Sequence, residues 1–109
     1  MVSYPKRDEV WLIALDPARG AEIKKTRPCL VVSPDDANEP LQTVLIAPMT
    51  RTLRSYPTRV NISFQNKAGQ VALDQLRTVA HERLIRRLGV VTAKTAYAVS
   101  SVLVEMFTR

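Results

Sequence analysis

The apolar residues of this 109-residue chain fall into short runs, each closed by a proline, a glycine or a charged segment. Runs of about four to eight residues rich in β-branched side chains are typical of β-strands, because helices need longer periodic stretches. One run, Thr58–Phe64, also alternates polar and apolar residues with the period of a half-buried strand. We expect strands at Glu9–Leu15, Pro28–Ser33, Thr43–Pro48, Thr58–Phe64, Gln70–Asp74, Arg77–Val79 and Leu88–Val91.

The segments between these runs predict turns and loops. Asp16 and Pro17 end the first strand, and the residues from Arg19 to Arg27 have little to bury, which predicts a long exposed loop. Pro28 is placed at the start of the second strand, where a missing N–H is tolerated. The other connections are Pro34–Pro40 with one helical turn, the basic loop Thr50–Pro57 and a turn at Lys67–Gly69.

The last segment changes from the period of a strand to that of a helix. Thr92 is suited to cap the N-terminus of a helix. Short strands followed by one helix predict a mainly β fold, a small curled sheet or barrel with a C-terminal α-helix. The chain length predicts a single domain over residues 1–109. The apolar stripe of this helix is formed by Ala96, Val99, Val102, Leu103, Met106 and Phe107.

The charge of the chain is positive and unevenly spread. Sixteen Lys and Arg against ten Asp and Glu give a net charge of +6, and the span Leu41–Leu73 holds no acid. A positive field attracts nucleic acid, an anionic membrane or an acidic protein. The membrane is the weakest of these partners, because the sequence shows no basic amphipathic helix. A basic surface without a particular partner is the alternative.

Several features predict a cytoplasmic location. The single cysteine, Cys29, cannot form an internal disulfide, which fits a reducing compartment. The first residues contain Asp8 and Glu9 where a signal peptide would need an apolar stretch. No apolar run approaches the length that spans a bilayer.

A series of short motifs runs in order over nearly the whole chain, and together they resemble the MazF/PemK/Kid family of toxins. Each motif alone is weak evidence, but their shared register is specific. The motifs are Glu9–Pro17, Gly20–Glu22, Lys25–Pro28, Val31–Ser33, Ala47–Thr50, Pro57–Val60, Leu73–Val79 and Arg87–Gly89.

The resemblance implies a fold and an activity. The fold would be the PemK-type, SH3-like curled β-barrel with a C-terminal helix, in agreement with the strand pattern. The activity would be that of a homodimeric, ribosome-independent endoribonuclease that cuts single-stranded RNA at short sequences without metal or other cofactor. The products would be a 2′,3′-cyclic phosphate or 3′-phosphate and a 5′-hydroxyl. The partner would be a cognate antitoxin whose acidic, disordered tail covers the RNA groove.

Cleavage of RNA through its own 2′-hydroxyl needs a proton acceptor, a group that stabilises the phosphorane, and a proton donor to the 5′-oxygen. The one histidine, His81, has only Glu82 beside it, so the sequence predicts no metal site. A cationic side chain is therefore expected to stabilise the phosphorane. Arg27 has the bidentate geometry for a phosphate, and the resemblance implies that Arg27 and Thr50 are catalytic. The alternatives are a surface arginine and a threonine that caps a turn.

The proton acceptor has two candidates in the sequence. Asp74 and Glu22 are the carboxylates nearest the motifs. Asp74 matches an acid that Kid-type members use, but Ala72 and Ala21 stand where those members carry an arginine and a histidine. Arg27 with Thr50 is therefore favoured over the Kid-type arrangement. Asp74 could equally form a structural ion pair with Arg77.

Further basic residues are expected to follow the RNA backbone. Few aromatic side chains are available to stack on bases, since Trp11 is expected in the core, which leaves Tyr4 and Tyr56. His81 is expected to be a turn residue. The predicted RNA-binding residues are Lys24, Lys25, Arg51, Arg54 and Arg77.

Two other functions are compatible with the same sequence. Gyrase poisons of the CcdB type share this fold, and a fold alone does not fix function. A non-catalytic module that binds RNA or protein would keep the basic groove without turnover.

Overall fold

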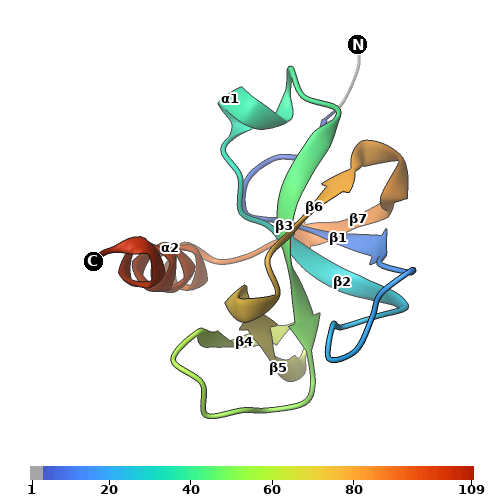
Figure 1. The fold of residues 1–109 in the computed structure, drawn as a ribbon. Coiled ribbons are helices and arrows are strands. Elements are labelled where there is room, and N and C mark those ends of the chain that lie inside the picture. Colours follow the sequence, from blue (N-terminus) through green and yellow to red (C-terminus); the bar gives the residue numbers. More distant parts are fainter. Residues whose placement is uncertain (1–3) are drawn as a thin grey trace.

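The computed structural model describes residues 4–109 and consists mainly of β-strands, with one long helix at the C-terminus (Figure 1). This confirms the predicted fold class. The strands are β1 (Glu9–Ala14), β2 (Thr26–Val31), β3 (Thr43–Thr50), β4 (Arg59–Phe64), β5 (Lys67–Ala72), β6 (Arg77–Ala80) and β7 (Leu84–Val90). The helices are α1 (Asp35–Asn38), η1 (Leu73–Gln75), η2 (His81–Arg83) and α2 (Ala93–Phe107), of which η1 and η2 are 3₁₀ turns.

The strands form one antiparallel sheet in which β3 is the central element. The order is β4-β5-β3-β2-β1-β7, and β6 also pairs with β3. The first half of β3 pairs with β6, and its last residues pair with β5, at Met49↔Val71 and Thr50↔Gln70. Because β5 and β6 share one side of β3, the sheet curls into the half-barrel seen in Figure 1.

The curled sheet has two hydrophobic cores. One lies between the sheet and α2 and includes Leu30, Val71 and Val99. The other is built around Ile13 and Ile46 and also contains Cys29, which is fully buried. Successive residues of β2 alternate between the two cores. Leu30 lies in the first, and Cys29 and Val31 lie in the second, as expected for a strand buried on both faces.

Several predicted boundaries are wrong because strand pairing extends further than the apolar runs. Pro28 was predicted to begin the second strand but is the third residue of β2, because Thr26 and Arg27 already pair with β1. The Lys67–Gly69 segment belongs to β5, and the turn lies at Gln65 and Asn66, whose φ angles are +51° and +62°. The predicted strand Gln70–Asp74 ends at Ala72, where η1 follows, and β7 begins at Leu84 rather than Leu88.

The C-terminal helix follows its sequence pattern closely. The Thr92 hydroxyl accepts a hydrogen bond from the Thr95 backbone N–H at 3.3 Å, which confirms the predicted N-cap. Val99 is buried, but Phe107 is 72% exposed and does not join the packed stripe. The single turn predicted within Pro34–Pro40 is confirmed by α1. In residues 4–109, no helix is both long and apolar enough to cross a membrane.

Candidate functional site

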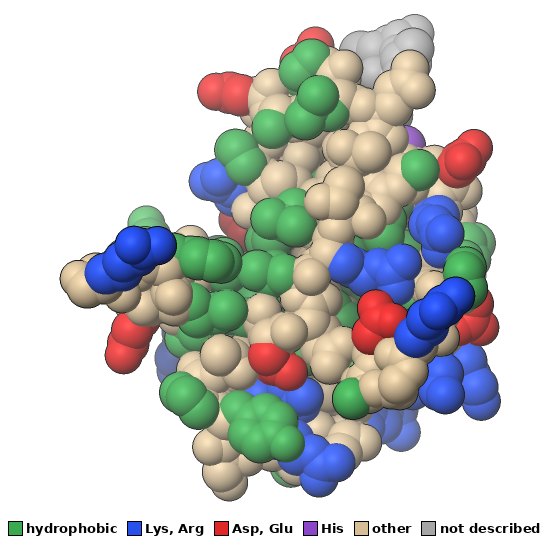
Figure 2. Space-filling model, in the orientation of Figure 1, with side chains coloured by type: hydrophobic (Ala, Val, Ile, Leu, Met, Phe, Trp, Pro, Cys, Tyr) green, Lys and Arg blue, Asp and Glu red, His purple; other side chains and the backbone are tan. Residues whose placement is uncertain are grey.

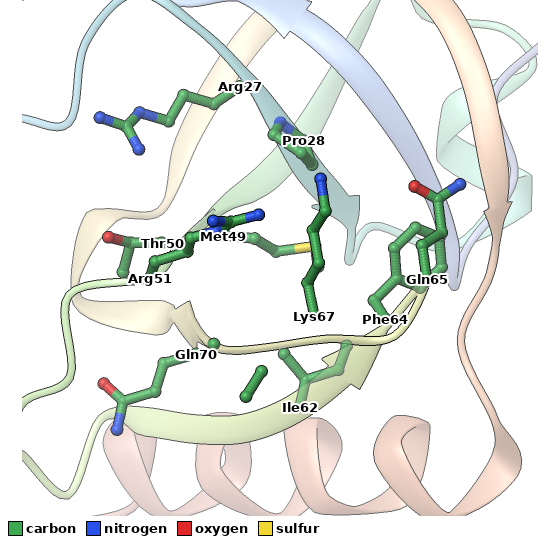
Figure 3. Close-up of a pocket in the computed structure, with 12 residues that line it drawn as sticks. Arg27, Pro28, Met49, Thr50, Arg51, Ile62, Phe64, Gln65, Lys67 and Gln70 are labelled. Atoms are coloured by element: carbon green, nitrogen blue, oxygen red, sulfur yellow. The ribbon is translucent and has the colours of Figure 1, made fainter.

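The pairing of β2 with β3 brings Arg27 and Thr50 together, although they are far apart in the sequence. The printed register of this antiparallel pair ends at Cys29 opposite Pro48, and Arg27 and Thr50 each lie two residues beyond that point, at the same end of the pair. Both side chains extend to the same side of the close-up in Figure 3. They also line the same two cavities, one on each side of the pair.

The Arg27 guanidinium is held at one nitrogen and open at its other end. Its Nε donates to the Lys24 carbonyl at 3.2 Å, which orients the side chain. The ion pairs among residues 4–109 are Arg59–Asp74 and Arg87–Glu9, so Arg27 has no carboxylate partner there. The terminal nitrogens are therefore available for an anionic ligand.

The Thr50 hydroxyl is oriented so that it can donate. Its oxygen accepts a hydrogen bond from the Thr52 N–H at 3.1 Å, which leaves the hydroxyl hydrogen free for a ligand. Gly69 allows the neighbouring strand to approach, since a Cβ at this position would lie 2.7 Å from the Thr50 carbonyl oxygen. A larger residue at position 69 would displace the backbone of Thr50.

The first cavity, which we call the carboxylate groove, has a volume of about 480 Å³. It brings four further candidate residues from the sequence, Glu22, Lys24, Arg54 and Asp74, together with Arg27 and Thr50. The structure adds residues that the sequence did not single out. The full lining is Ala21, Glu22, Ile23, Lys24, Arg27, Thr50, Thr52, Arg54, Tyr56, Arg59, Asp74 and Gln75.

The second cavity, which we call the cationic pocket, has a volume of about 270 Å³ and is shown in Figure 3. Arg51 lies here rather than in the carboxylate groove. The full lining is Arg27, Pro28, Met49, Thr50, Arg51, Ile62, Phe64, Gln65, Lys67, Ala68, Gly69 and Gln70.

Asp74 forms an ion pair with Arg59, and the predicted alternative pair with Arg77 is wrong. Arg59 donates from Nε to Asp74 Oδ1 at 2.7 Å and from Nη2 to Oδ2 at 3.3 Å. Arg77 instead donates from Nη1 to the Leu15 carbonyl at 3.0 Å, outside the carboxylate groove and the cationic pocket. The sequence could have singled out Arg59, because Arg59 lies in the Pro57–Val60 motif. Its partner could not be found in this way, because the partner depends on the register between β4 and β5.

This ion pair sets the charge state of Asp74. Partial burial alone would raise the pKa of Asp74, but hydrogen bonds from Arg59, its own backbone and Thr58 outweigh this effect and lower the pKa. The Arg59 guanidinium also lies 5.2 Å above the centre of the Tyr56 ring, in cation–π geometry. Asp74 is thus an anion with its oxygens engaged, which makes it a weak proton acceptor.

Two glutamines that sequence reasoning missed hold the loops of the groove. Gln75 accepts from the Ile23 N–H at 3.1 Å and donates to the Ala21 carbonyl at 3.2 Å. Gln70 accepts from the Arg54 N–H at 3.0 Å and donates to the Arg54 carbonyl at 3.0 Å. Each amide therefore pairs with backbone as a strand would, and fixes one wall of the groove.

The remaining residues of the first loop have different positions. The Glu22 carboxylate accepts from the Arg19 N–H at 2.5 Å and borders the groove. Lys25, with a φ of +71°, donates its backbone N–H to Asp16 at 2.9 Å and lines neither cavity. In Figure 2 Lys and Arg side chains gather on the side of this loop, whereas hydrophobic side chains gather beside α2.

Of the other predicted residues, only Tyr56 lies in the groove. Tyr4 packs instead near Lys6, whose ammonium lies 5.8 Å from the ring centre. Trp11 is half-buried and packs against the core built around Ile13 and Ile46, and its Nε1 donates to Glu9 at 3.0 Å. His81 begins the turn η2, as predicted. Within residues 4–109, no three His, Cys, Asp or Glu side chains cluster as a metal site would require.

Comparison with known proteins agrees with this fold and these motifs. The sequence profile of the PemK-like, MazF-like toxins of type II toxin–antitoxin systems matches residues 6–107. The chain belongs to this family. It is 37% identical over 98 residues to endoribonuclease MazF9 of Mycobacterium tuberculosis, covering 81% of this chain and 83% of that protein.

Solved structures of MazF proteins share the fold. A mycobacterial endoribonuclease solved in complex with its cognate antitoxin superposes with a TM-score of 0.79 at 26% identity, covering 93% of this chain and 92% of that one. MazF of Deinococcus radiodurans has a TM-score of 0.84 at 23% identity, with 96% and 97% of the two chains covered. The family resemblance inferred from the motifs is thereby confirmed. Arg27 and Thr50 thus lie at the same end of two neighbouring strands of a MazF-type fold and line the same two cavities.

Proposed function

We propose that this MazF-family protein is a metal-independent, sequence-specific endoribonuclease that cuts single-stranded RNA. The observation that carries the proposal is the Arg27–Thr50 pair, in which an unpaired guanidinium and a hydroxyl donor face one space. Two donors of this kind suit the oxygens of a phosphodiester. The MazF relatives are endoribonucleases, which supports the same class of activity.

The reaction begins with attack of the 2′-oxygen on the adjacent phosphorus. The O2′–P bond forms, the P–O5′ bond breaks, and the products are a 2′,3′-cyclic phosphate and a 5′-hydroxyl. Arg27 binds the non-bridging oxygens and stabilises the added charge of the phosphorane, while Thr50 donates a hydrogen bond to one of them. Because the guanidinium keeps its charge at any working pH, this stabilisation does not depend on pH.

Glu22 is the better placed proton acceptor of the two carboxylates. Asp74 is already bound by Arg59 and Thr58, and its pKa is lowered. Glu22 is exposed at the groove and receives a single backbone hydrogen bond, from Arg19. We assign to Glu22 the removal of the 2′-hydroxyl proton and to Asp74 the positioning of Arg59.

The cations around the pair bind the RNA backbone. Lys24 and Arg54 border the carboxylate groove, Arg51 borders the cationic pocket, and exposed Lys25 adds long-range attraction. Arg77 is assigned a structural role, since its guanidinium holds Leu15.

The same cationic surface suits an acidic inhibitor. The mycobacterial neighbour was solved with its cognate antitoxin. We propose that an acidic, disordered tail of a cognate antitoxin competes with RNA for this groove in the cytoplasm, and that the toxin is a homodimer.

The test is to incubate the purified protein with single-stranded RNA in EDTA and to map the fragment ends. We expect cuts at a short sequence with 5′-hydroxyl ends, and no cut where the cleaved nucleotide carries a 2′-deoxy substitution. Cutting that survives this substitution would overturn the mechanism. RNA binding without product would indicate a non-catalytic module, and inhibition of supercoiling instead of RNA cleavage would indicate a gyrase poison.

A further inference from the structure

The cationic pocket differs from an ordinary surface hollow in its unbalanced charge. Arg27, Arg51 and Lys67 line it, and no carboxylate does so among residues 4–109. In Figure 3 Lys67 extends from β5 across the pocket toward Pro28, and the Arg51 guanidinium also turns toward this space. Neither Arg51 nor Lys67 takes part in the ion pairs of the described residues. Converging cations without a counterion favour an anionic ligand.

Below these cations the pocket is apolar. Pro28 and Met49 form one side, and Ile62 and Phe64 form the other, as Figure 3 shows. The volume of about 270 Å³ is close to the lower end of small-ligand sites, about 300 Å³. An apolar floor under a cationic rim suits a planar base with an attached phosphate better than it suits a phosphate alone.

Gln65 supplies a hydrogen-bonding group at the edge of the pocket. It lies in the β4–β5 turn, and its Nε2 donates to the Leu88 carbonyl at 3.4 Å. The amide oxygen then faces the pocket, as Figure 3 shows. This oxygen can accept a hydrogen bond from an N–H on a base edge, and it would repel a carboxylate.

The pocket also continues the path of the candidate active site. It shares Arg27 and Thr50 with the carboxylate groove, so the two cavities lie on either side of this pair. A strand whose cleaved phosphate contacts the pair has its neighbouring nucleotides on both sides. The nucleotide on the side of the pocket would then reach the mouth of the pocket.

We propose that the cationic pocket is a nucleotide-binding subsite, and this rests on the proposed function. It takes one nucleotide next to the cleaved bond, with the base on the apolar floor and the phosphate between Arg51 and Lys67. Gln65 reads the base edge and so helps to determine which sequence is cut.

The direct test measures binding of the four nucleoside 5′-monophosphates and of inorganic phosphate, with backbone amide shifts in NMR spectra as the readout. We expect shifts at Ala68 and Gly69, tighter binding of the best mononucleotide than of phosphate, and about tenfold weaker binding after Lys67→Ala. The matched control is Lys94→Ala, an exposed lysine on α2, which should leave binding unchanged. Equal affinity for phosphate, or equal effects of the two lysine variants, would overturn the proposal.

The specificity test compares cleavage maps of the wild type and Gln65→Asn. Asparagine tolerates the positive φ of the turn but withdraws the amide from the pocket. We expect the preferred base at one position beside the cut to change, with the thermal midpoint unchanged. Two results together would overturn the subsite alone. Gln65→Asn would cut RNA at the same sites as the wild type, and Lys67→Ala would bind nucleotides as tightly as the wild type.

The two proposals fail in different ways. If the protein does not cleave RNA but binds nucleotides in a way that depends on Lys67, the proposed nuclease activity is overturned and the nucleotide-binding pocket is retained. Binding of a glutamate-rich peptide that depends on Lys67, with no binding of mononucleotides, would make the pocket a peptide site and overturn the subsite.

Discussion

The carboxylate groove and the cationic pocket lie on either side of Arg27 and Thr50, yet their charges are organised in opposite ways. In the groove, Asp74 is bound by Arg59, and Gln75 holds the loop that carries Glu22. In the pocket, the cations have no such partners among residues 4–109. On our proposals, the groove would be arranged in advance for chemistry, whereas the pocket would be completed by its ligand.

The strongest test of this comparison removes the group that both cavities share. Arg27→Ala should lower kcat/KM for RNA about 10³-fold, because a preorganised charge donor to the phosphorane is lost. Steady-state cleavage of a short RNA measures the effect, and circular dichroism should show an unchanged fold. Residual activity within tenfold of the wild type would contradict the assignment of Arg27.

Gly69→Ala should disturb the boundary between the two cavities. The new Cβ would meet the Thr50 carbonyl oxygen at 2.7 Å, so β3 and β5 must separate. Moving the backbone of Thr50 by about 1 Å near the reacting atoms can lower the rate about 100-fold, and we expect kcat to fall by that order. Ser63→Ala, an exposed change on the adjacent strand β4, is the control and should stay within twofold of the wild type.

Gln75→Ala should affect only the groove side. Its amide holds the backbone at Ile23 and Ala21, so the loop that carries Glu22 becomes less ordered. We expect kcat to fall about tenfold with a smaller change in KM, because positioning rather than binding is lost. Mononucleotide binding to the cationic pocket should not change, and a parallel loss there would show that the two cavities are not independent.

Asp74→Asn should change the pH dependence of stability. The lowered pKa of Asp74 means that its ionised form stabilises the folded state. This stabilisation is complete above the ordinary aspartate pKa of about 3.9 and is lost as the pH falls through the lowered value. The variant should therefore be about 0.5–1 kcal/mol less stable at pH 7, the range for a partly exposed pair, and should converge with the wild type in acid. Thermal unfolding between neutral and acidic pH measures this.

Arg54→Gln should produce the smallest effect. Loss of one contact to single-stranded RNA lowers the slope of log affinity against log salt by about 0.7. Arg77→Gln is the contrasting variant, since Arg77 bonds to the Leu15 carbonyl and lies outside both cavities. A salt slope that changes with Arg77 and not with Arg54 would reverse these assignments.

The fold was predictable because it depends on local signals, whereas Arg27 and Thr50 were singled out through the family resemblance. Short apolar runs mark strands, and the motifs around Arg27 and Thr50 lie at strand ends. The Arg59–Asp74 pair was not predicted, because it depends on the β4–β5 register, which places Arg59 opposite Ala72, and on the turn η1 that follows and carries Asp74. The sequence offered Arg77, three residues from Asp74, as a possible partner, because Arg59 comes near Asp74 only after the sheet forms.

The glutamines show the same limit. The sequence around a glutamine gives no sign of which backbone groups its side-chain amide will bind. Gln70 reaches Arg54 because β5 pairs with the end of β3, and Gln75 reaches Ile23 because η1 lies against the first loop. Tertiary contacts of this kind connect segments that no local pattern relates.

The burial of Cys29 has a practical consequence for studying this protein. Burial raises the pKa of its thiol to about 12, against the opposing effect of nearby arginines. The thiol therefore stays protonated and reacts slowly with maleimides and similar reagents at neutral pH. Because it is the single cysteine of the chain, a second one introduced on the exposed loop would be labelled selectively. A fluorophore attached there would report the arrival of RNA or of an inhibitor without removal of the native thiol.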